Sequence, residues 1–164
     1  GSAASQKIFF MKLPLTGAES IYIFIFIYIL IVLFTMSGKF TKDSLWVPFF
    51  LVFLTFFSVS HYHPQWFSWI TPFFIILLVL KKEYKSITAA LFILYLLLVF
   101  FFESSLTWGL FGPVNHSLYS APSLTDMLPK FIDTAMVKSI FRSVFAAIAV
   151  YLAVKLLREK AYDI

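Results

Sequence analysis

The residues best suited to chemistry lie in a short polar stretch between two long apolar runs. Residues 60–66 read Ser-His-Tyr-His-Pro-Gln-Trp and hold two of the three histidines, His61 and His63. Polar groups at the edge of hydrocarbon need hydrogen-bonding partners. Pro64 has no N–H and a fixed φ, so it suits the first turn of a new helix. The stretch therefore predicts the tip of a helical hairpin, whose polar side chains either bind a ligand or simply meet water.

A metal or haem site can be drawn from the histidines, but their spacing does not require one. On a helix His61 and His63 would point about 200° apart, so they could share a metal only in an extended turn. His116, in a later loop, could complete a three-histidine site. All three lie at helix ends or in loops, whereas haem ligation in a bundle normally uses histidines within a span. We therefore expect no metal and no cofactor.

Acidic residues and one arginine are the remaining candidates. Glu103, Asp126 and Asp133 could each act as a general base, but carboxylates in outer loops are usually solvated. The sequence has no Ser-His-Asp order, no glycine-rich phosphate loop and no paired-carboxylate spacing. Arg142, one turn into the last predicted helix, could bind a lipid phosphate or extend to the membrane surface. No catalytic residue can be named on this basis.

The composition is that of an integral membrane protein. Apolar residues make up 61% of the 164 residues and charged residues 13%. Residues 21–36 and 87–102 carry no charge and approach the ~20 residues that cross a bilayer. The absence of cysteine excludes disulfides, Cys-ligated zinc, iron–sulfur clusters and thiol catalysis. The net charge of +5 lies mainly beside the helices and requires no nucleic-acid partner. The sequence thus predicts an all-α helical bundle whose first partner is the lipid bilayer.

The apolar runs predict about five transmembrane helices and one interfacial amphipathic helix in a single domain, residues 6–164. Residues 1–5 resemble a tag remnant or linker. Residues 6–20 read as an interfacial segment or the tail of a short amphipathic helix, ended by a Pro-Leu-Thr-Gly break. Residues 124–136 place apolar side chains on one face, which predicts a helix on the membrane surface. The expected spans are residues 18–37, 45–60, 64–80, 86–102 and 137–157.

The basic residues predict the orientation. With alternating helices, the turns after the first, third and fifth spans share one side, which the positive-inside rule makes cytoplasmic together with the C-terminus. The His61–His63 hairpin and the loop at residues 103–136 then face outward. The N-terminus also faces outward without a cleaved signal, which suggests a fragment normally preceded by further helices. The cytoplasmic side holds eight of the 13 basic residues, Lys39, Lys42, Lys81, Lys82, Lys85, Lys155, Arg158 and Lys160.

The hairpin resembles a motif of a known family. The run His63-Pro64-Gln65-Trp66-Phe67, with Ser60 before it and Trp69 and Pro72-Phe73 after it, resembles the start of a late span in mannosyltransferase-like members of the C superfamily of polytopic membrane glycosyltransferases. Residues 12–20 look like the loop before a neighbouring span. The family implies transfer of a sugar from a polyprenyl-phosphate-linked donor on the outer face. The resemblance places His63 and Gln65 near the substrate and gives Trp66, Trp69 and Pro72 structural roles.

The chain also departs from the family's pattern. The family's catalytic acid lies in the first outer loop, whereas the first loop here, residues 38–44, is on the predicted cytoplasmic side and has Asp43 as its only acid. Family members also have more spans. The resemblance therefore implies a C-terminal part that contributes a lipid groove and hairpin contacts without the catalytic base.

Three functional readings follow. The first is a glycosyltransferase part acting on a polyprenyl-phosphate-linked sugar, which the resemblance favours. The second is a non-enzymatic small membrane subunit or scaffold that packs against further helices or a partner subunit, which the length and the missing catalytic loop favour. The third is a quinone- or haem-binding subunit using the three histidines. Whether the chain is an enzyme stays open. The substrate-binding residues expected under the first reading are His61, His63, Gln65, Trp66, His116 and Arg142.

Overall fold

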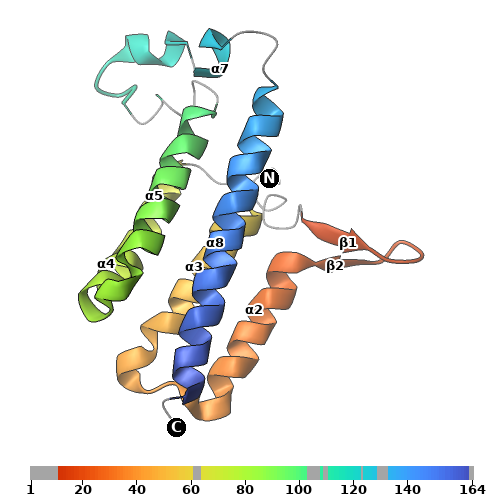
Figure 1. The fold of residues 1–164 in the computed structure, drawn as a ribbon. Helices are drawn as coiled ribbons and strands as arrows, with labels where there is room; N and C mark the ends of the chain where they lie inside the picture. Colours follow the sequence, from red (N-terminus) through yellow and green to blue (C-terminus); the bar gives the residue numbers. More distant parts are fainter. Residues whose placement is uncertain are drawn as a thin grey trace.

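The computed structural model describes residues 11–60, 64–102, 108, 111–122, 124–128 and 133–162, and this part of the chain is mostly helical (Figure 1). A short antiparallel hairpin, β1 (Lys12–Pro14) and β2 (Ser20–Tyr22), precedes the helices. Six α-helices lie within the described residues: α2 (Ile23–Phe34), α3 (Trp46–Val59), α4 (Thr71–Leu80), α5 (Lys85–Phe100), α7 (Leu124–Met127) and α8 (Thr134–Tyr162).

Three helices are long and apolar enough to cross a membrane, as an integral membrane protein requires. They are Lys42–Val59, Lys82–Phe100 and Thr134–Glu159, with mean hydropathies of 1.4, 1.7 and 2.0. Only 22–39% of the residues in their most apolar stretches are buried inside the molecule. Apolar helices with so much exposed surface are stable in hydrocarbon rather than in water. Two further apolar helices, Ile23–Ser37 and Pro64–Leu80, are shorter.

Most predicted spans coincide with helices and differ from them only at the ends. The spans at residues 45–60 and 86–102 correspond to α3 and α5. The span at residues 64–80 begins as a 3-10 helix, η4 (Pro64–Trp69), and becomes α-helical only in α4. A proline in the first turn of α4 explains this change, because proline donates no hydrogen bond to the preceding turn. The last helix, α8, begins earlier than predicted because the Asp133 carboxylate accepts a hydrogen bond from the Met136 N–H at 3.0 Å.

The first predicted span, residues 18–37, is wrong at its start, and residues 11–20 form no helical tail. Leu13 pairs with Ile21 across the hairpin, so the chain stays extended until α2 begins at Ile23. Gly17, with φ +82°, makes the turn that this pairing needs. At its other end α2 continues as a π-helical turn, η2 (Thr35–Lys39). Residues 6–10 lie outside the described part of the chain.

The surface helix predicted at residues 124–136 is also not continuous. Its described part consists of the four-residue helix α7 and the first turn of α8, with Leu128 in a bend between them. Leu128 precedes Pro129, and the residue before a proline is disfavoured in the helical region. The one-sided apolar pattern therefore indicated a helix continuing through residue 128, where α7 has already ended at Met127; residues 129–132 lie outside the described part of the chain.

The core lies between α3, η4, α4, α5 and α8. Buried side chains on α8 recur at Phe145, Ala149, Leu152 and Leu156, which is the spacing of one helix face. In a membrane such a core is stabilised by close packing rather than by removal of apolar surface from water. The helix α2 packs against α3 at the edge of this core, with Ile31 touching it, and none of the residues of α2 is buried. The largest buried side chains elsewhere are Phe50, Phe57, Phe74, Tyr84, Phe102, Leu54, Ile70, Leu77, Leu91 and Leu98.

A polar cluster closes the end of the bundle where the α4–α5 turn and the C-terminus lie (Figure 1). Lys81 forms an ion pair with Glu159, and the Tyr84 hydroxyl donates a hydrogen bond to the same carboxylate. The Lys155 ammonium lies 4.5 Å from the centre of the Tyr84 ring, within cation–π range. This cluster, Lys81, Tyr84, Lys155 and Glu159, fixes α8 against the turn that contains the 3-10 helix η5 (Lys82–Tyr84).

Candidate functional site

Arg142, on α8, contacts the start of the predicted helical hairpin at residues 60–66. Its Nη1 donates a hydrogen bond of 2.7 Å to the carbonyl oxygen of Ser60, the residue that follows α3. Ser60 is fully buried, and a hydrogen bond from a charged donor to a buried carbonyl contributes about 1.5–3 kcal/mol. The structure therefore brings together Arg142 and the start of the motif, which are 82 residues apart in the sequence.

The side chain of Ser60 is the second feature of this end of the bundle. Its Oγ is buried and has no hydrogen-bond partner within the part of the chain that the structure describes. An unsatisfied buried hydroxyl costs about 1–3 kcal/mol, so such groups call for an explanation. This hydroxyl lies on the same residue whose carbonyl accepts from Arg142, so both groups belong to this end of the bundle. The sequence placed Ser60 within the motif but did not single it out as substrate-binding.

The turn η4 is anchored by aromatic contacts that leave Gln65 on the surface. The buried ring of Phe67 stacks on Tyr95 of α5 with 3.7 Å between ring centres. The Tyr95 hydroxyl donates a hydrogen bond of 2.6 Å to the carbonyl of Pro64. Gln65 is exposed, and Trp66, half-buried, stacks on Trp69 with ring centres 5.4 Å apart.

Tyr95 is a functional candidate that the sequence analysis missed. It lies within the run at residues 87–102, where it is the only side chain other than threonine that carries a polar group. A tyrosine hydroxyl in hydrocarbon needs a partner, which is the signal that could have pointed to its contact with the hairpin. Its role is to position Pro64 and Phe67, and with them the motif.

The histidines give no support for a metal site in the described chain. His116 lies in η6 (His116–Ser120), an exposed 3-10 turn between α5 and α7. His61 and His63 lie outside the described residues. Among the residues that the structure does describe, no group of three or more His, Asp or Glu side chains could hold a metal ion.

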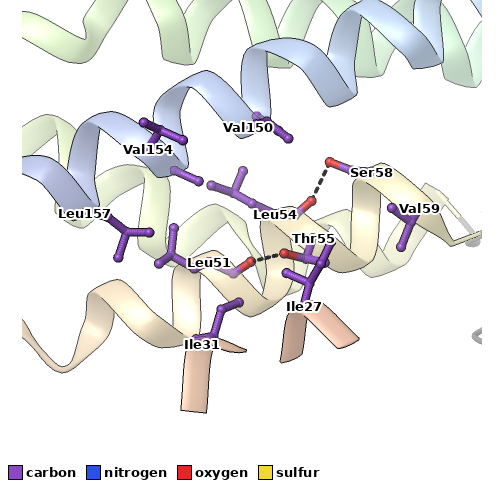
Figure 2. A pocket seen from close by; sticks show the side chains of 12 residues that line it. Ile27, Ile31, Leu51, Leu54, Thr55, Ser58, Val59, Val150, Val154 and Leu157 are labelled. Carbon is purple, nitrogen blue, oxygen red and sulfur yellow. Dashed lines mark hydrogen bonds between the residues drawn. The ribbon is translucent and has the colours of Figure 1, made fainter. Parts of the chain in front are cut away.

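An apolar cleft of about 210 Å³ lies between α2, α3 and α8 (Figure 2). The hydroxyls of Thr55 and Ser58 in its wall donate to carbonyls of their own helix, at 2.8 Å to Leu51 and 2.7 Å to Leu54. These hydroxyls therefore have their hydrogen bonds within α3, and the lining of the cleft is apolar. The lining residues are Ile27, Ile31, Leu51, Leu54, Thr55, Ser58, Val59, Ala149, Val150, Ala153, Val154 and Leu157.

The end of this cleft at Val59 lies next to the Ser60–Arg142 contact. Val59, at the end of α3, lines the cleft, and the next residue accepts the hydrogen bond from Arg142. On α8, Arg142 shares a helix face with Ala149 and Ala153, which follow it by seven and eleven residues. Ala149 lies about 10 Å along the axis from Arg142, at about 1.5 Å per residue. The cleft thus extends from Val59, beside the Ser60 carbonyl, toward the opposite, basic end of the bundle, and Arg142 itself does not line it.

Comparisons with known proteins do not identify the chain. Among protein-family models, curated proteins and solved structures, none matches it. The chemistry of the cleft and of the Ser60–Arg142 end is therefore the basis for a functional assignment.

Proposed function

We propose that this chain is part of a membrane glycosyltransferase that moves a sugar from a polyprenyl-phosphate-linked donor on the outer face of the membrane. Its part in that reaction is to bind the lipid portion of the donor. The observation that supports this most is the apolar cleft that ends at Val59, one residue before the Ser60 carbonyl that Arg142 contacts. A polyprenyl phosphate has a long apolar chain with an anion at one end, and the cleft and the guanidinium offer matching chemistry in the same order.

The candidate residues then have distinct roles. Arg142 binds the phosphate and the Ser60 hydroxyl donates a hydrogen bond to one of its oxygens. Gln65, which is exposed beside the anchored turn, contacts the sugar, together with His61, His63 and His116 from the outer loops. Trp66 supplies a ring face near the same end. The general base belongs to a part of the enzyme other than this chain.

The proposal includes a topology of five spans. The two shorter apolar helices, Ile23–Ser37 and Pro64–Leu80, are the remaining two spans. A bilayer can thin locally around spans of this length. The end that carries the Lys81–Glu159 pair is cytoplasmic by the positive-inside rule, as is the C-terminus. The His61–His63 hairpin and residues 103–136 then face outward, together with Arg142.

Binding of farnesyl phosphate, a short isoprenoid phosphate, tests the proposal. Tryptophan fluorescence of the full chain in detergent micelles is titrated with farnesyl phosphate and, in parallel, with farnesol. We expect Arg142→Gln to weaken binding of farnesyl phosphate by about tenfold, or about 1.4 kcal/mol, without changing binding of farnesol. Ala149→Phe, which fills the cleft, should weaken binding of both.

Lys138→Gln is the matched control for the loss of charge. Lys138 lies one turn before Arg142 on α8, and its ammonium is 6.0 Å from the Phe102 ring rather than at the cleft. This variant should bind farnesyl phosphate as the unmodified chain does. Equal weakening by Lys138→Gln and Arg142→Gln, or no preference for the phosphate over the alcohol, would contradict the proposal.

A second candidate function is that of a non-enzymatic subunit that packs against further helices. It rests on α2, none of whose residues is buried and whose Phe26 and Leu33 are 52% and 58% exposed. Phe26→Ala and Leu33→Ala would then dissociate a larger assembly purified from native membranes, as measured by its mass. An unchanged mass would leave α2 as a lipid-facing helix.

A further inference from the structure

The hairpin β1–β2 has two chemically different faces. Leu13 pairs with Ile21, Lys12 with Tyr22 and Pro14 with Ser20. Because side chains alternate along a strand, Leu13 and Ile21 lie on one face, and the other two pairs lie on the opposite face. Hydrogen bonds from Ile23 N–H to the Met11 carbonyl (3.1 Å) and from Leu15 N–H to the Glu19 carbonyl (3.0 Å) extend the ladder at both ends. Met11 and Leu15 thereby join the apolar face, with Glu19 at its tip beside the turn.

The apolar face is uncovered by the described chain. Leu13 is 55% exposed, Met11 51%, Leu15 48% and Ile21 39%. Figure 1 shows the hairpin extending sideways from the start of α2, away from the other helices. A two-stranded hairpin is at best marginally stable by itself in water. An amphipathic hairpin held in this position therefore needs an apolar medium on one face.

The bilayer is the medium that the neighbouring residues indicate. The hairpin continues directly into α2, whose Phe26 and Ile29 are about half exposed and apolar, as for a lipid-facing helix. Tyr22 and Lys12, opposite each other at this junction, are residue types that lie at the boundary of the membrane. An open sheet edge cannot lie in hydrocarbon, because its unpaired N–H and C=O groups would lose their water.

We propose that the hairpin lies flat in the lipid headgroup layer and binds the membrane surface. Met11, Leu13 and Ile21 face the acyl chains. Lys12 faces the headgroups, with Ser20 and Tyr22 beside it, and its charge attracts anionic lipid. Glu19, on the same face as Ile21 but at the tip beside Gly17, remains within the headgroup layer. This role is independent of any donor bound in the cleft.

Site-directed spin labelling tests the proposal, because the chain has no cysteine and each label can be placed alone. Leu13→Cys reports the apolar face and Ser20→Cys the polar face of the same hairpin. The full chain is labelled with a nitroxide in vesicles of phosphatidylcholine and phosphatidylglycerol. Collision rates are then measured with oxygen, which concentrates in lipid, and with a water-soluble nickel chelate. Ile29→Cys on α2 and Thr16→Cys in the turn are the lipid and water references.

The label at residue 13 should collide mainly with oxygen, as at residue 29, and the label at residue 20 mainly with the nickel chelate, as at residue 16. Ile21→Cys repeats the test of the apolar face at its second paired residue. Strong collision with nickel at residues 13 and 21 would overturn the proposal, since the face would be in water. Weak collision with both reagents there would also overturn it, since protein would then cover the face.

Discussion

Replacing Glu159 with Ala should destabilise the bundle much more than replacing Lys81 with Met, although each change removes the same ion pair. The side chains of Lys81 and Glu159 are 28% and 30% exposed. Ion pairs with this access to solvent contribute about 0.2–1 kcal/mol to the free energy of unfolding. Lys81→Met should therefore cost no more than about 1 kcal/mol.

Glu159 has a second partner that makes the difference. The Tyr84 hydroxyl donates to its carboxylate, and Tyr84 is fully buried. Glu159→Ala leaves that hydroxyl without a hydrogen-bond acceptor. The buried, unpaired hydroxyl lowers the free energy of unfolding by about 1–3 kcal/mol, in addition to the loss of the ion pair. In a Tyr84→Phe background no hydroxyl remains to be stranded, so Glu159→Ala should then cost only the ion pair, at most about 1 kcal/mol. The double-mutant cycle thus separates the two contributions.

The free energy of unfolding can be measured by far-UV circular dichroism as sodium dodecyl sulfate is titrated into mixed micelles of the full chain. We expect Glu159→Ala to lower the free energy of unfolding more than Lys81→Met does, and to lower it much less in the Tyr84→Phe background. Equal costs for Glu159→Ala and Lys81→Met, or an unchanged cost of Glu159→Ala when Tyr84 is Phe, would refute it.

Three further predictions concern the anchoring of η4 and the turn of the β1–β2 hairpin. Phe67→Ala should cost about 3–5 kcal/mol in the same unfolding assay because it empties a buried position, whereas Trp69→Ala, which is 52% exposed, should cost far less; similar costs would mean that Phe67 does not anchor η4. Tyr95→Phe should lower stability by about 1 kcal/mol by removing the donor to the Pro64 carbonyl while keeping the ring stack; a neutral result would exclude that hydrogen bond. Gly17→Ala has open space for its Cβ, so its cost is the backbone strain of φ +82°, about 1–2 kcal/mol, seen as faster amide exchange at Leu15 and Ile23; unchanged exchange would contradict the turn.

The helices of the bundle could be predicted because long uncharged runs permit little else. The runs at residues 45–60 and 86–102 became α3 and α5 with ends shifted by one or two residues. The β1–β2 hairpin was missed because residues 6–20 were read as an interfacial segment or the tail of an amphipathic helix, and residues 18–22 as the start of the first span. Met11, Leu13 and Leu15 alternate with polar or proline residues, and Gly17 allows the turn. That period of two, together with the glycine, was the available signal.

The candidate site could be predicted only in part, because its contacts join distant segments. The motif indicated the hairpin tip, and Arg142 was suggested by its charge within an apolar helix. Nothing in the sequence links Arg142 to Ser60, 82 residues earlier, or Tyr84 to Glu159, 75 residues later. These contacts depend on how α8 packs between α3 and α5. The cleft arises in the same way, since α8 forms it together with the consecutive helices α2 and α3 from far earlier in the chain.

Photo-crosslinking is the most direct test of the central claim that the cleft binds an isoprenoid phosphate. Farnesyl phosphate with a diazirine on its terminal isoprene is irradiated with the full chain in nanodiscs, and the adducts are mapped by mass spectrometry. We expect adducts on partly buried cleft residues of α3 and α8, such as Val59 and Ala153, that excess farnesyl phosphate suppresses and Arg142→Gln reduces. Adducts spread over outward residues such as Val79 and Ile93, unaffected by competitor or by Arg142→Gln, would contradict it.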